Sequence, residues 1–178
     1  SYAIREASGM LTLRAHFPVA QIEFERQVEL RGRAVHIRET VESMAAYDRP
    51  IAWTQHVTLG PPFLEKGVTQ FRASATRSKV FEGRFGDDDY LRAGAEFDWP
   101  DAPRIDDSDC TDGGVADMRV FNNAPASSAF TTHLMDAACE DAFFAAFAPA
   151  WRLGFGYVWK RADFPWLGIW EENHSRTH

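Results

Sequence analysis

Hydrophobic and polar residues alternate along the first third of the chain with a period of two, which is the spacing of strands that bury one face. The pattern runs through MLTLRAHF (10–17), AQIEFERQVELRG (20–32) and RAVHIRETVES (33–43), with a change of phase at Thr40 and Val41 that indicates a β-bulge. Three further stretches have the pattern of strands bounded by Gly, Pro or Asp-rich turns, namely 50–58, 68–76 and 78–84. A succession of short strands without an intervening helix predicts an antiparallel sandwich or barrel.

The second half contains one ambiguous segment and one clear one. Alanine and leucine in 131–148 favour a helix by intrinsic propensity, whereas the runs AFTTHLM and AFFAAFA suit two buried strands joined by DAACED. Because the surrounding frame is all-β, we expect the two strands. Aromatic residues alternate over 151–159 around Gly154 and Gly156, and a further strand is expected over 166–172. Glycines beneath a row of aromatic residues are typical of close sheet packing or of a ligand lying on the sheet.

The fold class that we predict is all-β, an antiparallel β-sandwich. The 178 residues are expected to form one domain over 1–178, or a fragment of one, because domains commonly span roughly 100–200 residues. The composition is 45% hydrophobic with 6 Trp and 14 Phe, which is enough for a sizeable core. After Asn173 we see no closing strand, so the sheet would keep an open edge, and a longer fold or a homodimer would cover it.

Negative charge is concentrated in one segment. The net charge is −7, and residues 86–117 alone carry eleven Asp or Glu and two Arg, a net of −9. We expect this segment to be a long acidic loop in contact with solvent. A calcium site is the alternative, but the Asp-x-Asp-x-Asp-Gly template is not met, since Thr111 stands where the third acid belongs. No basic stripe is present, which argues against a nucleic-acid partner.

Other partners and cofactors lack a sequence signature. The chain has no run of about 18 apolar residues, so no membrane partner is expected. Phosphate-cradling and nucleophile-elbow motifs do not occur, and His133 and Asp136, together with His56, lack the tight spacing of metal ligands. We therefore expect no cofactor and no metal. With only Cys110 and Cys139 and no CxxC motif, a cytoplasmic location is predicted.

His56 is the first candidate for chemistry. It lies near the end of the expected strand 50–58, just before the turn Gly60-Pro61-Pro62, and strand ends are where a rigid sheet presents side chains to a ligand. An imidazole can give or take a proton near neutral pH. The alternative is a half-buried histidine that bonds to a backbone carbonyl group.

The segment WEENHS (170–175) is the second candidate, because it gathers carboxylates, an amide and an imidazole beside tryptophans. Aromatic rings can hold the C–H face of a sugar, while Glu, Asn or His bind its hydroxyls. The candidate substrate-binding residues are Trp53, Phe63, Trp170, Glu171, Asn173 and His174, with Trp166 as a further aromatic face. Glu171 and Glu172 point to opposite faces of a strand, so only one of them can share a site with its neighbours. The alternative is that the tryptophans are core residues.

Two stretches resemble galactose mutarotase (aldose 1-epimerase) proteins. ETVESMAAYDRPIAWTQHVTLGPPFLE resembles a strand that leads into a histidine and a Gly-Pro turn, and PAWRLGFGYVWKRADFPWLGIWEEN resembles a pair of late strands. The resemblance covers about 50 residues and implies a large β-sandwich, the galactose mutarotase-like supersandwich. It also implies that the chain is the middle-to-late part of that fold, incomplete at both ends.

The resemblance further implies acid–base catalysis at the anomeric carbon of a sugar. His56 would protonate the ring oxygen while a glutamate takes the proton of the anomeric hydroxyl, so that the ring opens and closes as the other anomer. In one alignment the glutamate is Glu172. In the other it lies beyond His178, and Glu171 or Glu172 is then a sugar contact.

Three functions remain open at this point. The first is an aldose 1-epimerase-like isomerase, and the second is a non-catalytic carbohydrate-binding β-sandwich, both with a small-molecule sugar as partner. The third is a β-sandwich interaction module whose acidic segment 86–117 meets a partner protein. Catalysis needs His56 and a carboxylate close together across a cleft, whereas binding needs only an aromatic floor and partners for hydroxyls. The interaction module predicts no sugar-dependent change in stability.

Overall fold

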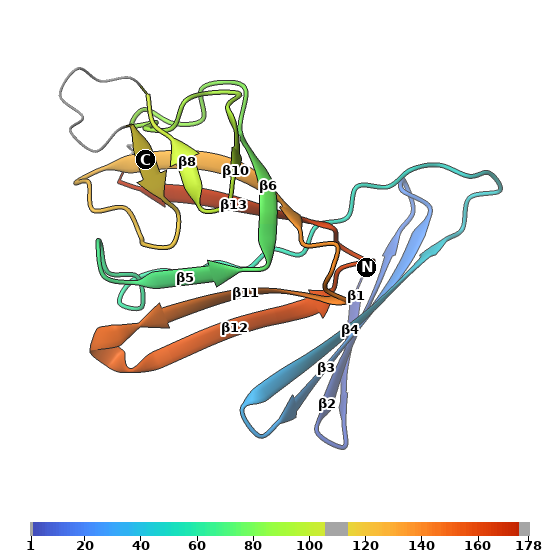
Figure 1. Cartoon of the computed structure of the whole chain (residues 1–178). Coiled ribbons are helices and arrows are strands. Elements are labelled where there is room, and N and C mark those ends of the chain that lie inside the picture. The colour runs from blue at the N-terminus through green and yellow to red at the C-terminus, as the bar shows by residue number, and fades with distance from the viewer. Residues whose placement is uncertain (1, 106–113, 175–178) are drawn as a thin grey trace. The chain divides into compact units, whose positions relative to one another are not determined.

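The computed structural model describes residues 2–105 and 114–174, which form antiparallel sheets and contain no α-helix (Figure 1). The all-β prediction is thereby confirmed. No helix in these residues reaches the length and hydropathy that crossing a membrane requires. Contacts divide the chain into two compact units, Ser1–His56 and Val57–His178. We predicted a single domain over 1–178. That the two units fold together as one domain stays a prediction.

The N-terminal unit is a four-stranded meander in which each strand pairs with the next. Its strands are β1 (Tyr2–Ala7), β2 (Met10–Phe17), β3 (Ile22–Arg31) and β4 (Ala34–Ser43). The register places Leu11, Val28 and Ile37 side by side on one face. On the other face, Arg14 and Glu25 form an ion pair at 2.6 Å. The period-two alternation of the sequence therefore separates an apolar face from a charged face, as predicted.

The β-bulge expected at Thr40 and Val41 does not occur in this pair of strands, because the register of β3 with β4 runs without a shift. Val41 is in phase with Ile37. Between them, Glu39 occupies a position on the apolar face, where its carboxylate accepts a hydrogen bond from Arg26 at 2.5 Å. A polar residue on the apolar face interrupted the sequence pattern without changing the phase of the strand.

The strand expected over 50–58 is not formed, so the prediction that His56 lies near a strand end is wrong. This segment is attached to the meander by side chains instead. The Nε1–H group of Trp53 donates to Glu39 at 3.1 Å, and the ring of Trp53 lies 5.3 Å from the ring of Phe24. The alternation in this segment reflects the docking of side chains onto a sheet, rather than a ladder of backbone hydrogen bonds.

The C-terminal unit contains three sheets. Its strands are β5 (Gln70–Ala73), β6 (Ala75–Val80), β7 (Glu96–Asp98), β8 (Asp101–Pro103), β9 (Val115–Asp117), β10 (Ser127–Met135), β11 (Asp141–Ala148), β12 (Leu153–Lys160) and β13 (Trp166–Asn173). The strand orders are β13-β10-β6-β7, β12-β11-β5 and β8-β9. The two late strands, β12 and β13, are both formed as expected, but they lie in different sheets and are not a hydrogen-bonded pair.

The ambiguous segment 131–148 forms two strands, as the all-β frame predicts. β10 pairs with β13 on one side and β6 on the other, while β11 pairs with β12 and β5. Ala142, Ala146 and Ala148 of β11 are buried. Pairing with strands on both sides places these alanines in a sheet, so tertiary structure overrides helix propensity.

The described part of the acidic segment 86–117 is not the solvated loop that its charge suggested. It contains β7, β8 and β9, and its apolar residues Leu91, Ala102 and Ala116 belong to a buried cluster against which Trp99 packs. Apolar residues at wide spacing among the aspartates point inward, which a count of charges does not reveal. Thr111, at which the alternative calcium template fails, lies outside the described residues.

His133 lies in the interior of the first sheet, with 0% of its surface exposed. Its Nδ1 and Nε2 atoms lie 2.8 Å from the hydroxyl oxygens of Ser78 and Thr131, respectively. Because the Ser78 hydroxyl donates to the carbonyl oxygen of Thr76, it accepts from Nδ1–H, and Nε2 accepts from Thr131. The ring of Trp99 lies 5.0 Å away, edge to face. Burial lowers the pKa of His133 to about 4, so the neutral ring is part of the core.

We predict that stability falls as the pH is lowered from 6.5 to 4. In this window the unfolded chain binds a proton on His133 that the folded chain does not, because the pKa is 6.5 unfolded and about 4 folded. The loss should reach about 3 kcal/mol at pH 4, at 1.36 kcal/mol per pKa unit. In urea denaturation, the free energy of unfolding of His133→Gln should lack this part of the pH dependence. The exposed His36→Gln serves as control, and a slope unchanged by His133→Gln would contradict the prediction.

Candidate functional site

The residues predicted for a sugar site are distributed over both units. Trp53 and His56 belong to the N-terminal unit, where His56 is exposed and Trp53 is half-buried against Phe24. Phe63 and the segment 170–174 belong to the C-terminal unit. The predicted catalytic pair, His56 and Glu172, is therefore divided between the units, and its assembly into one site stays a prediction.

Phe63 and His174 lie in turns. Phe63 is half-buried in the turn that follows Pro62, and its carbonyl oxygen accepts a hydrogen bond from the Thr69 hydroxyl at 3.1 Å. His174 is exposed directly after β13 and has a left-handed backbone conformation, with φ of 53°. Neither residue is positioned by a strand.

The outer face of β13 brings together several predicted residues. Opposite residues of an antiparallel pair share a face, so the register of β13 with β10 defines this surface. From β13 it contains Trp166, Gly168, Trp170 and Glu172, and from β10 it contains Leu134, Thr132, Phe130 and Ser128. Trp166 is 56% exposed and Trp170 is 55% exposed. The prediction that only one of the two glutamates can share this face is met by Glu172, which is also exposed.

Aromatic rings support Trp170 from one side. The ring of Phe85 meets the ring of Trp170 edge to face at 5.3 Å, and it lies 5.6 Å from the ring of Phe130. Phe81 lies 5.9 Å from Phe130 and 6.4 Å from Phe85. Trp170 is therefore an exposed ring on an aromatic base. Beside it, the ring of Phe130 packs against Gly168, 3.4 Å from the position that a Cβ atom would take.

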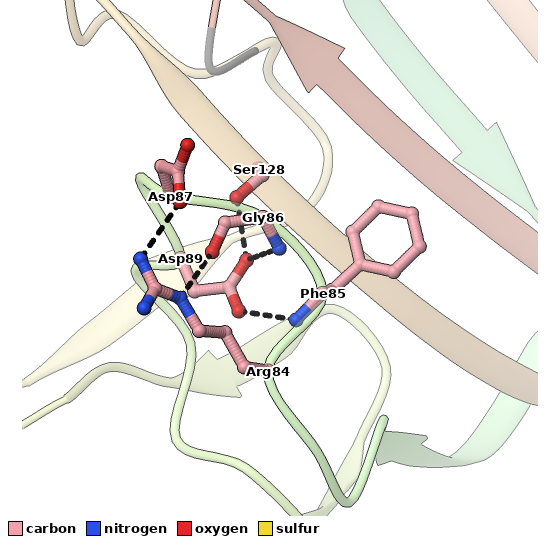
Figure 2. Close-up of polar contacts among 6 residues, drawn as sticks. All are labelled: Arg84, Phe85, Gly86, Asp87, Asp89 and Ser128. Carbon is pink, nitrogen blue, oxygen red and sulfur yellow. Dashed lines mark hydrogen bonds and ion pairs between the residues drawn. The ribbon is translucent and has the colours of Figure 1, made fainter.

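Phe85 belongs to a tight turn that Asp89 organises (Figure 2). The Asp89 carboxylate accepts hydrogen bonds from the backbone N–H of Phe85 at 2.6 Å and of Gly86 at 2.8 Å. It also accepts from the Ser128 hydroxyl of β10, and the backbone N–H of Ser128 donates to the carbonyl oxygen of Asp88 at 2.9 Å. The turn is thus attached to the strand that lies beside β13.

The inner face of β13 has a different chemistry. The Glu171 carboxylate accepts hydrogen bonds from the Tyr90 hydroxyl at 2.9 Å and from the Ser127 hydroxyl, and Asn173 donates to Ser127 at 3.2 Å. Burial raises the pKa of Glu171, an effect that the two hydroxyl donors oppose. Burial and the neighbouring Glu171 charge raise the pKa of Tyr90 as well. Glu171 and Asn173 therefore lie on the face opposite to Trp170.

Sequence reasoning missed Phe81, Phe85 and Asp89. Their signal is the segment FEGRFGDDD (81–89), in which two phenylalanines flank a glycine-containing turn and an aspartate follows three residues after Gly86. Aspartate in such a position commonly accepts from backbone N–H groups of its own turn. The turn is attached through Ser128, which is distant in the sequence, so the linear sequence does not reveal this contact.

A second surface feature lies on the sheet β12-β11-β5. Gly154 and Gly156 lie opposite Phe147 and Ala145, respectively, and with Arg72 they line an open groove of about 510 Å³. The glycines under the row 151–159 thus form a shallow trough on the exposed face, while the rings of the row lie on the other face of β12. Most residues that line this groove are apolar, and its two polar side chains, Gln70 and Arg72, belong to β5.

No family model matches the chain, and no curated protein or solved structure shows significant similarity to it. In residues 2–105 and 114–174, no three His, Cys, Asp or Glu side chains come together as metal ligands would. The function of the site must therefore be inferred from its own side chains.

We predict that Glu171→Gln changes the pH dependence of stability in the opposite sense to His133→Gln. A carboxyl group whose pKa is raised by folding stabilises the protein at low pH, and this contribution is lost as the pH rises from the unfolded pKa through the folded one. Wild type should therefore lose stability relative to Glu171→Gln as the pH is raised. Urea denaturation between pH 4 and pH 7 measures this difference, and Glu172→Gln, at an exposed position, is the matched control. A constant difference across the range would contradict the assignment.

Proposed function

We propose that this protein binds a carbohydrate on the outer face of β13. The observation that carries the proposal is that Trp166 and Trp170, each more than half exposed, share one face of a single strand. Large aromatic rings are usually covered, and their exposure together on one surface indicates a binding site. The ring of Phe130, which packs against Gly168 on the same face, extends the aromatic surface on which a sugar ring could lie.

Polar groups suited to sugar hydroxyls lie on the same face. The exposed Glu172 carboxylate is an acceptor, and Thr132, opposite Gly168, offers a hydroxyl group. The two tryptophans are four residues apart, which in a strand corresponds to about 13 Å. A monosaccharide would therefore contact one tryptophan, and an oligosaccharide could contact both.

We also propose that the fold is a β-sandwich related to the galactose mutarotase-like supersandwich. Support comes from the antiparallel all-β architecture and from β12 and β13, which are formed within the second stretch that resembles galactose mutarotase proteins. The proposal accounts for an all-β chain with an exposed aromatic face on a late strand.

Interconversion of sugar anomers is a second candidate function, and the position of Glu172 favours it. This carboxylate is exposed beside Trp170, where a sugar stacked on the ring would bring its hydroxyls close. In the proposed reaction, Glu172 takes the proton of the anomeric hydroxyl and His56 protonates the ring oxygen. The ring opens to the aldehyde, rotation exposes the other carbonyl face, and closure returns both protons.

We predict that Trp170→Ala weakens sugar binding at least tenfold, equivalent to about 1.4 kcal/mol. Isothermal titration calorimetry of wild type with glucose, galactose, cellobiose and lactose identifies the sugar to use. Trp166→Ala should weaken binding of the disaccharides more than of the monosaccharides. Trp151→Ala, which removes an exposed tryptophan from the 3₁₀ turn before β12, is the matched control. Equal losses for Trp170→Ala and Trp151→Ala would refute the proposed face.

We predict that Glu172→Gln and His56→Ala each lower anomer exchange at least a hundredfold, since general acid–base groups commonly contribute about 10²–10⁴-fold. Saturation-transfer NMR on an equilibrium mixture of sugar anomers measures the exchange rate. His36→Gln, another exposed histidine of the N-terminal unit, is the control for His56→Ala. Sugar binding without any exchange in wild type would reject the catalytic candidate and leave carbohydrate binding as the function.

A further inference from the structure

The Asp89 carboxylate accepts three hydrogen bonds, two from its own turn and one from β10. One carboxylate oxygen accepts from the backbone N–H of Gly86 and from the Ser128 hydroxyl, and the other accepts from the backbone N–H of Phe85 at 2.6 Å. Figure 2 shows these three donors converging on the carboxylate, with the ring of Phe85 directed away from it. Asp89 therefore fixes the backbone of Phe85 relative to β10.

The fixed backbone determines where the ring of Phe85 lies. That ring meets Trp170 edge to face, with 5.3 Å between centroids and 87° between planes, and it packs against Phe130 at 5.6 Å. Trp170 is 55% exposed, so neighbouring side chains contact only part of it. The ring of Phe85 is thus one of the contacts that restrict the ring of Trp170.

We propose that Asp89 is a positioning residue for the sugar-binding face, acting through Phe85 on the orientation of Trp170. The inference rests on the proposed function. A side chain held in its binding rotamer loses less conformational freedom when a ligand arrives, so it binds more tightly than a mobile one. Asp89 acts through the backbone of Phe85, because its oxygens accept hydrogen bonds from Phe85, Gly86 and Ser128.

Aspartate has a chemical advantage at this position. Its two oxygens accept three hydrogen bonds, whereas the amide of asparagine accepts through one oxygen and presents N–H donors on the other side. In Asp89→Asn, the amide group would therefore face a backbone N–H or the Ser128 hydroxyl as a second donor. The substitution preserves the size of the side chain and removes at least one of the three hydrogen bonds that hold the turn.

Asp87 provides a matched control within the same turn. Its carboxylate is exposed and accepts a hydrogen bond from Arg84 at 2.8 Å, and Arg84 also donates to the carbonyl oxygen of Gly86 at 3.0 Å (Figure 2). Asp87→Asn removes one negative charge from the turn, as Asp89→Asn does, without removing an acceptor from Phe85. A difference between these two variants therefore reports on position rather than on charge.

The experiment uses protein labelled with 5-fluorotryptophan and fluorine NMR, with the Trp170 resonance assigned from Trp170→Phe. In the free protein, Asp89→Asn should shift and broaden the Trp170 resonance, and Phe85→Leu should do the same. Asp87→Asn should leave it at the wild-type position. The sugar chosen by calorimetry should bind about fivefold more weakly to Asp89→Asn and with unchanged affinity to Asp87→Asn.

The outcomes separate the inference from the proposed function. A wild-type Trp170 resonance in folded Asp89→Asn would overturn the positioning role, whatever the sugar affinity. A displaced resonance with no sugar binding by wild type would support the positioning role and reject the proposed function. If Asp89→Asn fails to fold, Ser128→Ala, which removes one of the three donors, takes its place. A smaller shift of the Trp170 resonance is then expected in the same direction, and the absence of this shift overturns the inference.

Discussion

The antiparallel pairing of β10 with β13 is the constraint on which the candidate site depends. Its register assigns every side chain of the two strands to one of two faces, because opposite residues point the same way. A shift by one residue would turn Trp166 and Trp170 inward and carry Glu171 to the surface. The same register holds Ser128 beside Glu172 and thereby gives the Asp89 turn its point of attachment. The aromatic surface and its support are thus consequences of one hydrogen-bonded ladder.

The inner face of this sheet has an unusually polar composition, and hydrogen bonds make it compatible with burial. His133 is hydrogen-bonded to both Thr131 and Ser78, and Glu171 accepts from Tyr90 and Ser127. In the described residues, no buried side-chain nitrogen or oxygen lacks a partner. Polar networks of this kind depend on geometry, since a displaced strand would leave several groups without partners at once. They therefore help to fix the register that the outer face requires.

Much of the strand pattern could be predicted from sequence, because alternation records which face of a strand is buried. It identified β2, β3 and β4, and within β13 it assigned only one of two adjacent glutamates to the face of Trp170. For 131–148, the all-β frame outweighed alanine propensity. The same alternation was misleading over 50–58, where Trp53 docks by its side chain rather than through a backbone ladder. It also said nothing of the Asp89 turn, whose anchoring partner Ser128 is distant in the sequence.

β13 lies at the end of its sheet, and this position separates ligand recognition from the stability of the fold, two properties that are often coupled in proteins. In the order β13-β10-β6-β7, the hydrogen-bonded pairing of β10 with β6 and of β6 with β7 does not involve β13. Substitutions at the exposed Trp166 or Trp170 can thus alter what this surface recognises while these pairings remain. New ligand preferences could arise in evolution by changing a few residues of one peripheral strand, while the polar interior that defines the architecture stays intact.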